Sequence, residues 1–224
     1  PSKKLRPIPV GKISIAQAYF LAFLLAACAI ILSFQISFTL GVVLFTYFFV
    51  YVVYSRYLKH LVIIDIFCLG FFFFLRILAG SVVAQVEMSH WIVIMTVLLA
   101  LFLGFNKRRQ ELRLLAEQPN KTSREVLEKY DFYFIDQMLG IITTSIVMVY
   151  MLYTFDARTV SEFGTKNLMY SIPFVYYGIF RYLYLIHKKQ IDGDPTKLLI
   201  EDKVMQLNII LWICVCVAVI YFKV

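Results

Sequence analysis

The sequence has few of the residues that build soluble catalytic and metal sites. Its four cysteines all fall inside apolar stretches, where we expect small buried side chains rather than a disulfide framework. Its three histidines are scattered over the connections between these stretches and form no metal-ligand pattern. A Ser–His–Asp arrangement and the glycine pattern of a phosphate-binding loop are also absent. The sequence therefore gives no support to a zinc site, a serine hydrolase or a P-loop nucleotide site.

Apolar residues, by contrast, make up 61% of the 224 residues, and the mean hydropathy is +0.79. A soluble domain is nearer half apolar, and about 20 mostly apolar residues are enough to span a bilayer. This pattern predicts an all-α, polytopic transmembrane helix bundle that forms one domain over residues 1–224. The seven predicted spans are 15–32, 36–55, 61–80, 91–106, 133–154, 167–186 and 204–222.

The net charge of +8 follows the order of these spans. Lys and Arg concentrate before the first span and in every second connection, whereas the other side holds only Arg158, Lys166 and Lys223. Because basic residues mark cytoplasmic loops, we expect the N-terminus and the connections at 56–60, 107–131 and 187–203 to be cytoplasmic. A basic patch on a soluble module, which nucleic-acid binding requires, is not seen.

The connection at 107–131 is too long and too charged for a simple turn. Thr122-Ser-Arg-Glu125 has the pattern of a capping box at a helix start. Val126, Leu127 and Tyr130 would give that helix one apolar stripe. We therefore predict a short amphipathic helix over the cytoplasmic mouth of the bundle.

Two charged residues, Asp65 and Arg76, lie inside the third span. Charges within the hydrocarbon are costly and usually face a partner or a wet cavity. The two residues are eleven positions apart, so they share a helix face at a separation of about 16 Å and cannot pair directly. Each therefore needs a partner on another helix or a water-filled cleft, unless it extends toward the nearer membrane surface.

Three basic clusters, at 3–6, 54–59 and 107–111, fall at the ends of apolar spans on the same predicted face. Tyr54 and Lys59, at the end of the second span, could hold a phosphate at the membrane edge. The first connection, Lys3-Lys-Leu-Arg6, is a further cluster. Topology alone would also explain both, because interfacial tyrosines and cytoplasmic cations are common in membrane proteins.

The strongest local signal is Asn106-Lys-Arg-Arg-Gln-Glu111, which continues the fourth span without a helix breaker. Lys107 and Glu111 then share a helix face. Lys107 and Arg108 suit phosphate oxygens, and Glu111 suits Mg²⁺, which prefers one or two carboxylates together with substrate phosphates. The alternative is a solvated helix end with one salt bridge.

The same segments carry a resemblance to a known family. Pro1-Ser-Lys-Lys-Leu-Arg-Pro7 is similar to the stretch that follows the first aspartate motif of UbiA-type intramembrane prenyltransferases. The remaining segments resemble, in order and spacing over the whole chain, the decaprenyl-phosphate phosphoribosyltransferase branch. They are Tyr54-Ser-x-x-Leu-Lys59, Gly70-Phe71, Leu75-Arg76, Ala79-Gly80, Lys107-Arg108-x-x-Glu111, Leu127-Glu-x-Tyr130, Pro173, Arg181-Tyr182 and Asp202.

This resemblance implies a nine-helix bundle in a bacterial inner membrane, with a cavity open to the cytoplasm. It implies Mg²⁺-dependent transfer of 5-phosphoribose from phosphoribosyl pyrophosphate to a polyprenyl (decaprenyl) phosphate, with release of pyrophosphate, for cell-envelope arabinan precursors. Lys59, Lys107, Arg108 and Glu111 are then expected to be catalytic, with Glu111 on the metal. The expected substrate-binding residues are Lys3, Arg6, Tyr54, Asp65, Arg76 and Arg181. The oligomeric state stays open, a homo-oligomer included.

The resemblance also carries expectations about what precedes Pro1. The first aspartate motif and two of the nine helices would lie before it, so we expect the chain as given to lack its main Mg²⁺ ligands and to be inactive alone. Two alternatives remain: an aromatic polyprenyltransferase of the same fold, of the 4-hydroxybenzoate type, and a membrane transporter or scaffold without chemistry. Broken helices or inverted repeats would favour a transporter, and neither is seen.

Overall fold

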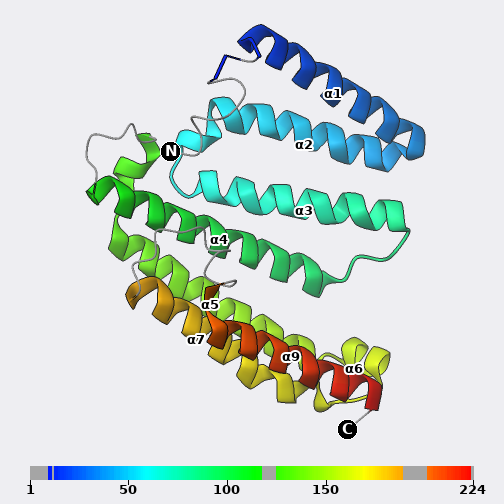
Figure 1. Ribbon diagram of the computed structural model, residues 1–224. Coiled ribbons are helices and arrows are strands. Elements are labelled where there is room, and N and C mark those ends of the chain that lie inside the picture. Colours follow the sequence, from blue (N-terminus) through cyan, green and yellow to red (C-terminus); the bar gives the residue numbers. More distant parts are fainter. Residues whose placement is uncertain (1–9, 12, 118–124, 189–200, 223–224) are drawn as a thin grey trace. The chain divides into compact units, whose positions relative to one another are not determined.

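The computed structural model describes residues 10–11, 13–117, 125–188 and 201–222, and these residues contain helices and connections but no strand (Figure 1). The all-α prediction is therefore confirmed. The α-helices are α1 (Ile15–Ile36), α2 (Phe38–Arg56), α3 (Ile64–Ala84), α4 (His90–Glu117), α5 (Phe132–Phe155), α6 (Ala157–Phe163), α7 (Ile172–Lys188) and α9 (Lys203–Phe222). The 3-10 helices are η2 (Leu58–His60), η3 (Glu125–Lys129) and η4 (Asn167–Ser171).

Six of these helices, α1 to α5 and α9, are long and apolar enough to cross a membrane. Six of the seven predicted spans are thus confirmed, and the chain is a multi-pass membrane protein. The prediction of one continuous span over 167–186 is wrong. That segment is divided into η4 and the 17-residue α7. Pro173 lies in the first turn of α7, where a residue without an N–H is tolerated, so the chain starts a new helix there.

The break between the first two helices, predicted at 33–35, lies later in the structure. Ser33 lies inside α1, where its hydroxyl donates to the carbonyl of Ile30 at 2.7 Å and is thereby satisfied within the helix. The break falls at Ser37, whose extended backbone (φ −161°, ψ 139°) ends α1 and precedes α2.

The described residues fall into two compact units. The first unit covers residues 1–57 and 75–88, and its helices α1 and α2 pack side by side as an antiparallel pair (Figure 1). Gly41 on α2 makes this possible, because a Cβ there would overlap the ring of Phe34 on α1. Small residues at such contacts let membrane helices approach closely.

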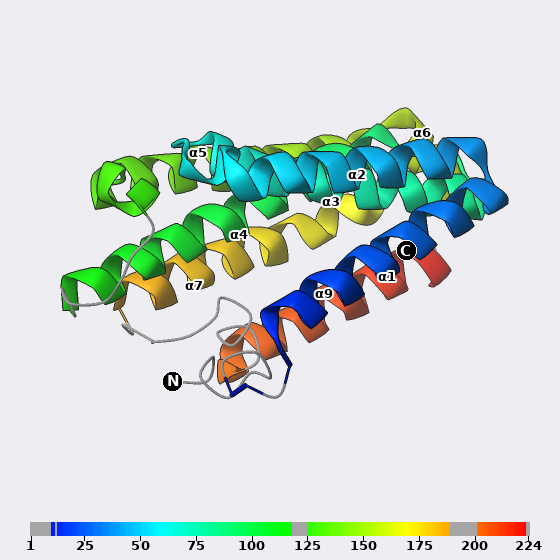
Figure 2. The ribbon, with the colours of Figure 1, turned by 90° about the horizontal axis from the view of Figure 1, so that it is seen from above.

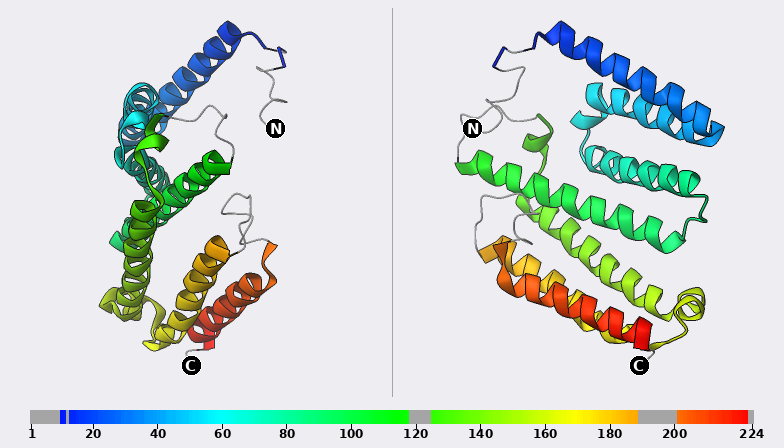
Figure 3. Two further views of the ribbon diagram at one scale, coloured as in Figure 1. Left: turned by 90° about the vertical axis from the view of Figure 1, so that its left-hand side faces the viewer. Right: turned by 45° about the vertical axis from the view of Figure 1, so that its right-hand side comes forward.

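The second unit covers residues 58–74 and 89–224, and it contains most of the buried residues. In this unit α4 packs against α5, α5 contacts α7, and α7 packs against α9 (Figure 3). The short helix η3 packs against both η2 and α4. The core of the unit is one hydrophobic cluster, in which Ile66, Phe105, Val126, Ile135, Leu139 and Leu185 are at most 2% exposed.

The predicted amphipathic helix at 122–130 is confirmed in part. Residues 125–129 form η3, a single 3-10 segment, and Val126, Leu127 and Tyr130 are all buried as the apolar stripe predicted. Thr122, and with it the predicted capping box, lies outside the described residues, as does most of the connection at 187–203.

Gly104 sets the distance between the start of α3 and α4 in the second unit. A Cβ at Gly104 would lie 2.6 Å from the Cγ2 methyl of Ile66, whose side chain is fully buried and has no room to move. Ile66 follows Asp65 directly, and Gly104 precedes Arg108 by about one helical turn. The missing side chain at Gly104 therefore lets α3 and α4 approach where these two charges lie.

We expect Gly104→Ala to destabilise the protein by about 1–3 kcal/mol, because overpacking a filled site forces side chains and backbone to shift. Gly140→Ala on α5 is the matched control, since a Cβ there meets no atom within 4 Å and alanine is the better helix former. Thermal unfolding in detergent should give a lower Tm for Gly104→Ala and an equal or higher Tm for Gly140→Ala. Equal melting of the two variants would contradict the close approach.

Candidate active site

A buried ion pair lies at the centre of the candidate site. Asp65, in the first turn of α3, is fully buried, and its Oδ2 accepts a hydrogen bond from Nε of Arg108 at 2.7 Å. Arg108 on α4 is itself only 3% exposed. A charge removed from water needs a closely placed opposite charge and further hydrogen bonds. Of the alternatives that the sequence left open for Asp65, the structure shows a partner on another helix.

Glu111 joins the same cluster from the next turn of α4. Nη1 of Arg108 donates to Oε2 of Glu111 in a short contact. This geometry exists because α4 is one uninterrupted helix through this region (Figure 2), as the sequence predicted. The partner of Glu111 is Arg108, at i−3, rather than Lys107 at i−4. Arg108 therefore bridges the two carboxylates.

Tyr130 completes the cluster from the residue after η3. Its hydroxyl donates to Oδ1 of Asp65 at 2.8 Å and accepts from the backbone N–H of Ile63 at 2.7 Å. Burial raises the pKa of the Tyr130 phenol well above its usual range. The bond from the Ile63 amide lowers that pKa, and the bond to Asp65 raises it. The phenol therefore stays protonated and remains a donor to Asp65.

The two predicted lysines of the site are less buried than Asp65 and Arg108. Lys59 is half-buried in η2, and Lys107 is exposed on α4. Neither ammonium group pairs with another side chain among the residues that the structure describes. Lys107 therefore differs from its neighbour Arg108, whose charge is buried and already compensated.

Three further predicted residues have structural partners. Arg76 and Tyr54 belong to the first unit, where Nη2 of Arg76 donates to the Tyr47 hydroxyl at 3.0 Å. The Arg76 guanidinium also lies 5.8 Å from the centre of the Tyr47 ring. In the second unit, Nη2 of Arg181 lies 2.9 Å from Oδ2 of Asp202. Lys3 and Arg6 lie outside the described residues.

Sequence reasoning missed several of these contacts. Asp202 accepts from Arg181 and also from the backbone N–H of Met205, so it joins α7 to the start of α9. Arg109 pairs with Asp136 on α5, with Nε at 2.6 Å from Oδ1. From the sequence, Tyr130 was placed in an apolar stripe and in the family resemblance, with no partner assigned to its hydroxyl. A usable signal was present, because Asp65 within an apolar span must find donors elsewhere in the chain.

The described residues can offer a divalent cation one carboxylate at this site. They hold no group of three His, Cys, Asp or Glu side chains arranged for a metal. Glu111 is 26% exposed, and of its two oxygens only Oε2 is bonded to Arg108 within the described part of the chain. A single carboxylate fits a cation that is held mainly by substrate phosphates, as Mg²⁺ commonly is.

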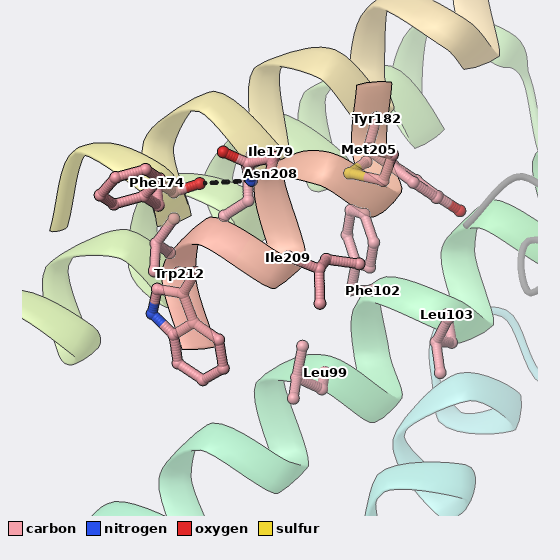
Figure 4. A pocket seen from close by; sticks show the side chains of 12 residues that line it. Leu99, Phe102, Leu103, Phe174, Ile179, Tyr182, Met205, Asn208, Ile209 and Trp212 are labelled. Atoms are coloured by element: carbon pink, nitrogen blue, oxygen red, sulfur yellow. Dashed lines mark hydrogen bonds between the residues drawn. The ribbon is translucent and has the colours of Figure 1, made fainter. Parts of the chain in front are cut away.

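A separate apolar groove of about 420 Å³ lies between α4, α7 and α9 (Figure 4). The Asn208 side chain in this groove donates to the carbonyl of Phe174 at 2.9 Å, so its amide is satisfied within the protein. None of the charged residues described above lines the groove, which suits hydrocarbon rather than phosphate. It is lined by Leu99, Phe102, Leu103, Phe174, Val175, Gly178, Ile179, Tyr182, Met205, Asn208, Ile209 and Trp212.

Comparison with known proteins finds one matching family and several similar proteins. Residues 1–210 match the UbiA prenyltransferase family. The chain is 29% identical over 228 residues to the decaprenyl-phosphate phosphoribosyltransferase of Mycolicibacterium smegmatis, with 100% of this chain and 71% of that protein covered. The protein of the same name from Corynebacterium glutamicum is 31% identical, with 98% and 66% covered. That from Mycobacterium tuberculosis is 27% identical, with 99% and 72% covered.

We expect Asp65→Asn to lower the free energy of unfolding by about 3 kcal/mol, because it leaves the buried Arg108 charge without its main partner. Glu162→Gln is the control. It breaks the Arg158–Glu162 pair, whose side chains are 56% and 58% exposed, and such pairs contribute little. Thermal unfolding of both variants in detergent measures the difference. An Asp65→Asn variant as stable as Glu162→Gln would show that the buried pair does not hold α3 to α4.

Proposed function

The chain belongs to the UbiA prenyltransferase family, and from this we propose that it transfers 5-phosphoribose from phosphoribosyl pyrophosphate to a polyprenyl phosphate, with release of pyrophosphate. The names of the relatives described above support this reaction, because three proteins that align with nearly the whole chain are decaprenyl-phosphate phosphoribosyltransferases. We take decaprenyl phosphate as the acceptor and the bacterial inner membrane as the location, with the site facing the cytoplasm.

The observation that carries the proposal is the arrangement of charge on α4 where its apolar stretch ends. Arg108 is buried between Asp65 and Glu111, so its charge is compensated inside the protein. Lys107 next to it is exposed, and Lys59 is half-buried in η2. Neither lysine is neutralised by another described side chain. The ammonium groups of Lys59 and Lys107 are therefore available to phosphate oxygens. Each lies where an apolar stretch of the chain ends, so a lipid phosphate and a water-soluble diphosphate can both reach it.

The reaction needs charge stabilisation more than it needs a protein nucleophile. An oxygen of the polyprenyl phosphate attacks the anomeric carbon of the ribose, and the bond from that carbon to the pyrophosphate oxygen breaks. The pyrophosphate leaves with the electron pair, and the carbon passes through an oxocarbenium-like state. Lys59 and Lys107 stabilise the charge that develops on the leaving group, which is commonly the largest catalytic contribution.

We assign Arg108 a positioning role, because its Nε and Nη1 atoms are engaged by Asp65 and Glu111. Glu111 is the residue of the described chain that would hold Mg²⁺, which would neutralise phosphate charge when bound. Asp65 was also expected to bind substrate, but it is fully buried and both its oxygens are engaged by Arg108 and Tyr130, so we assign it a positioning role as well. The candidate substrate-binding residues that remain are Lys3, Arg6, Tyr54, Arg76 and Arg181. For Arg181 the pairing with Asp202 supports a role in holding α7 to α9 instead.

We expect Lys107→Ala and Glu111→Gln in the full-length protein to lower turnover at least about 100-fold, because each removes an interaction with the leaving diphosphate. Lys166→Ala is the matched control, since Lys166 is a cation in the short connection after α6, on the predicted opposite face. The rate of pyrophosphate release from labelled membranes measures all three. Near-wild-type release by Lys107→Ala or Glu111→Gln would sink the assignment.

The choice of donor is tested separately. Membranes that contain the full-length protein should move label from phosphoribosyl pyrophosphate into the lipid fraction when polyprenyl phosphate is supplied. They should not form a prenylated ring from polyprenyl diphosphate and labelled 4-hydroxybenzoate. Formation of the aromatic product instead would identify the protein as an aromatic prenyltransferase of the same family.

A further inference from the structure

Tyr130 lies between two segments that carry the cations of the site. Its hydroxyl accepts from the backbone N–H of Ile63, three residues after η2, and donates to Asp65, which holds Arg108. Both bonds connect residues more than 60 positions apart in the chain. One oxygen atom therefore holds both the turn at Ile63, four residues after Lys59, and the Asp65 carboxylate that pairs with Arg108 on α4.

The bond to Ile63 falls on an unusual backbone position. Ile63 has a φ of 71°, in the left-handed region, which a β-branched residue adopts only when its surroundings hold it there. The next amide, that of Ile64, donates to the carbonyl of Val62 at 2.8 Å, so the chain turns tightly at this point. The Tyr130 hydroxyl supplies a side-chain partner that holds the Ile63 peptide in place.

We propose that Tyr130 is a positioning residue that fixes the Lys59 segment and the Arg108–Glu111 segment relative to each other, so that both sets of charges meet one diphosphate. The inference rests on the proposed function and concerns the diphosphate half of that site. It agrees with the packing of η3, the helix that Tyr130 directly follows, against both η2 and α4. Tyr130 touches no reacting atom in this assignment and acts through Ile63 and Asp65.

The role belongs to the hydroxyl group rather than to the ring. The ring is buried and packs near Phe134, with 6.1 Å between the ring centres, and Tyr130→Phe keeps this packing. Without the hydroxyl, the Ile63 amide loses its partner and Oδ1 of Asp65 loses a donor. We therefore expect the left-handed turn to relax and the Asp65–Arg108 pair to become less well ordered, with the fold retained.

The test uses the full-length protein in detergent and a second tyrosine as the matched control. Tyr150 on α5 is also partly buried, and its hydroxyl also makes two hydrogen bonds, with Ser171 at 2.7 Å and with Nε1 of Trp212 at 3.0 Å. Tyr150→Phe thus removes the same atom from a network without the charged cluster. Calorimetry with inorganic pyrophosphate and Mg²⁺ gives the affinity, and hydrogen exchange gives the protection of the Ile63 amide.

We expect Tyr130→Phe to weaken pyrophosphate binding about tenfold and to speed exchange at Ile63, whereas Tyr150→Phe does neither. In the transfer assay, Tyr130→Phe should raise KM for the diphosphate donor and leave KM for the lipid acceptor unchanged. A purely structural role would instead lower the active fraction and leave both KM values unchanged. Unchanged pyrophosphate affinity in folded Tyr130→Phe, or an equal loss in Tyr150→Phe, would overturn the proposal.

These outcomes separate the two proposals. Wild-type protein that binds pyrophosphate but transfers no phosphoribose contradicts the proposed function, and the effect of Tyr130→Phe on pyrophosphate still decides the positioning role. If Tyr130→Phe does not fold, hydrogen exchange at the Ile63 amide of the wild-type protein tests the positioning role instead. The Ile63 amide must then exchange slowly, and more slowly still with pyrophosphate bound. Exchange as fast as that of an open loop, unchanged by pyrophosphate, would overturn the inference.

Discussion

The candidate site depends on the burial of two opposite charges, Asp65 and Arg108, at the point where α3 meets α4. Neither charge is tolerated alone away from water, so each fixes the position of the other. The close approach at Gly104 brings the helices together, and the Tyr130 hydroxyl satisfies the second oxygen of Asp65. Glu111 is then held by the other side of the same guanidinium group.

In this arrangement, three arginines and two lysines of the second unit have different roles. Arg108, Arg109 and Arg181 are each paired with a carboxylate of the second unit and hold helices together. The planar guanidinium suits such pairs because it donates several hydrogen bonds in fixed directions. Lys59 and Lys107 have no described partner and are compact ammonium groups. In a phosphoribosyl transfer at a membrane surface, these are the charges free to follow a diphosphate as it binds and leaves.

Much of the fold could be predicted from the sequence, because membrane spans depend on composition over about 20 residues. Six spans, the continuation of α4 through Glu111 and the buried stripe at Val126, Leu127 and Tyr130 were predicted correctly. The errors were local. Ser33 lies inside α1, and Pro173 lies in the first turn of α7 after a 3-10 segment, so two element boundaries differ from the predicted ones while the fold does not. The short helix α6 was not predicted, because seven residues give too little periodicity.

The sequence by itself determined which residues carry charge where apolar stretches end, and that Asp65 needed a partner on another helix, a water-filled cleft or an extension toward the membrane surface. Only the tertiary structure decided that this partner is Arg108, 43 positions away, with Tyr130 as the second donor. It also decided that Arg181 meets Asp202 within the protein. The physical reason is that a span is encoded by neighbouring residues, whereas the partner of a buried charge is selected by packing. Asp65, Arg108 and Tyr130 lie on three separate segments, and only the folded chain brings them within hydrogen-bonding distance.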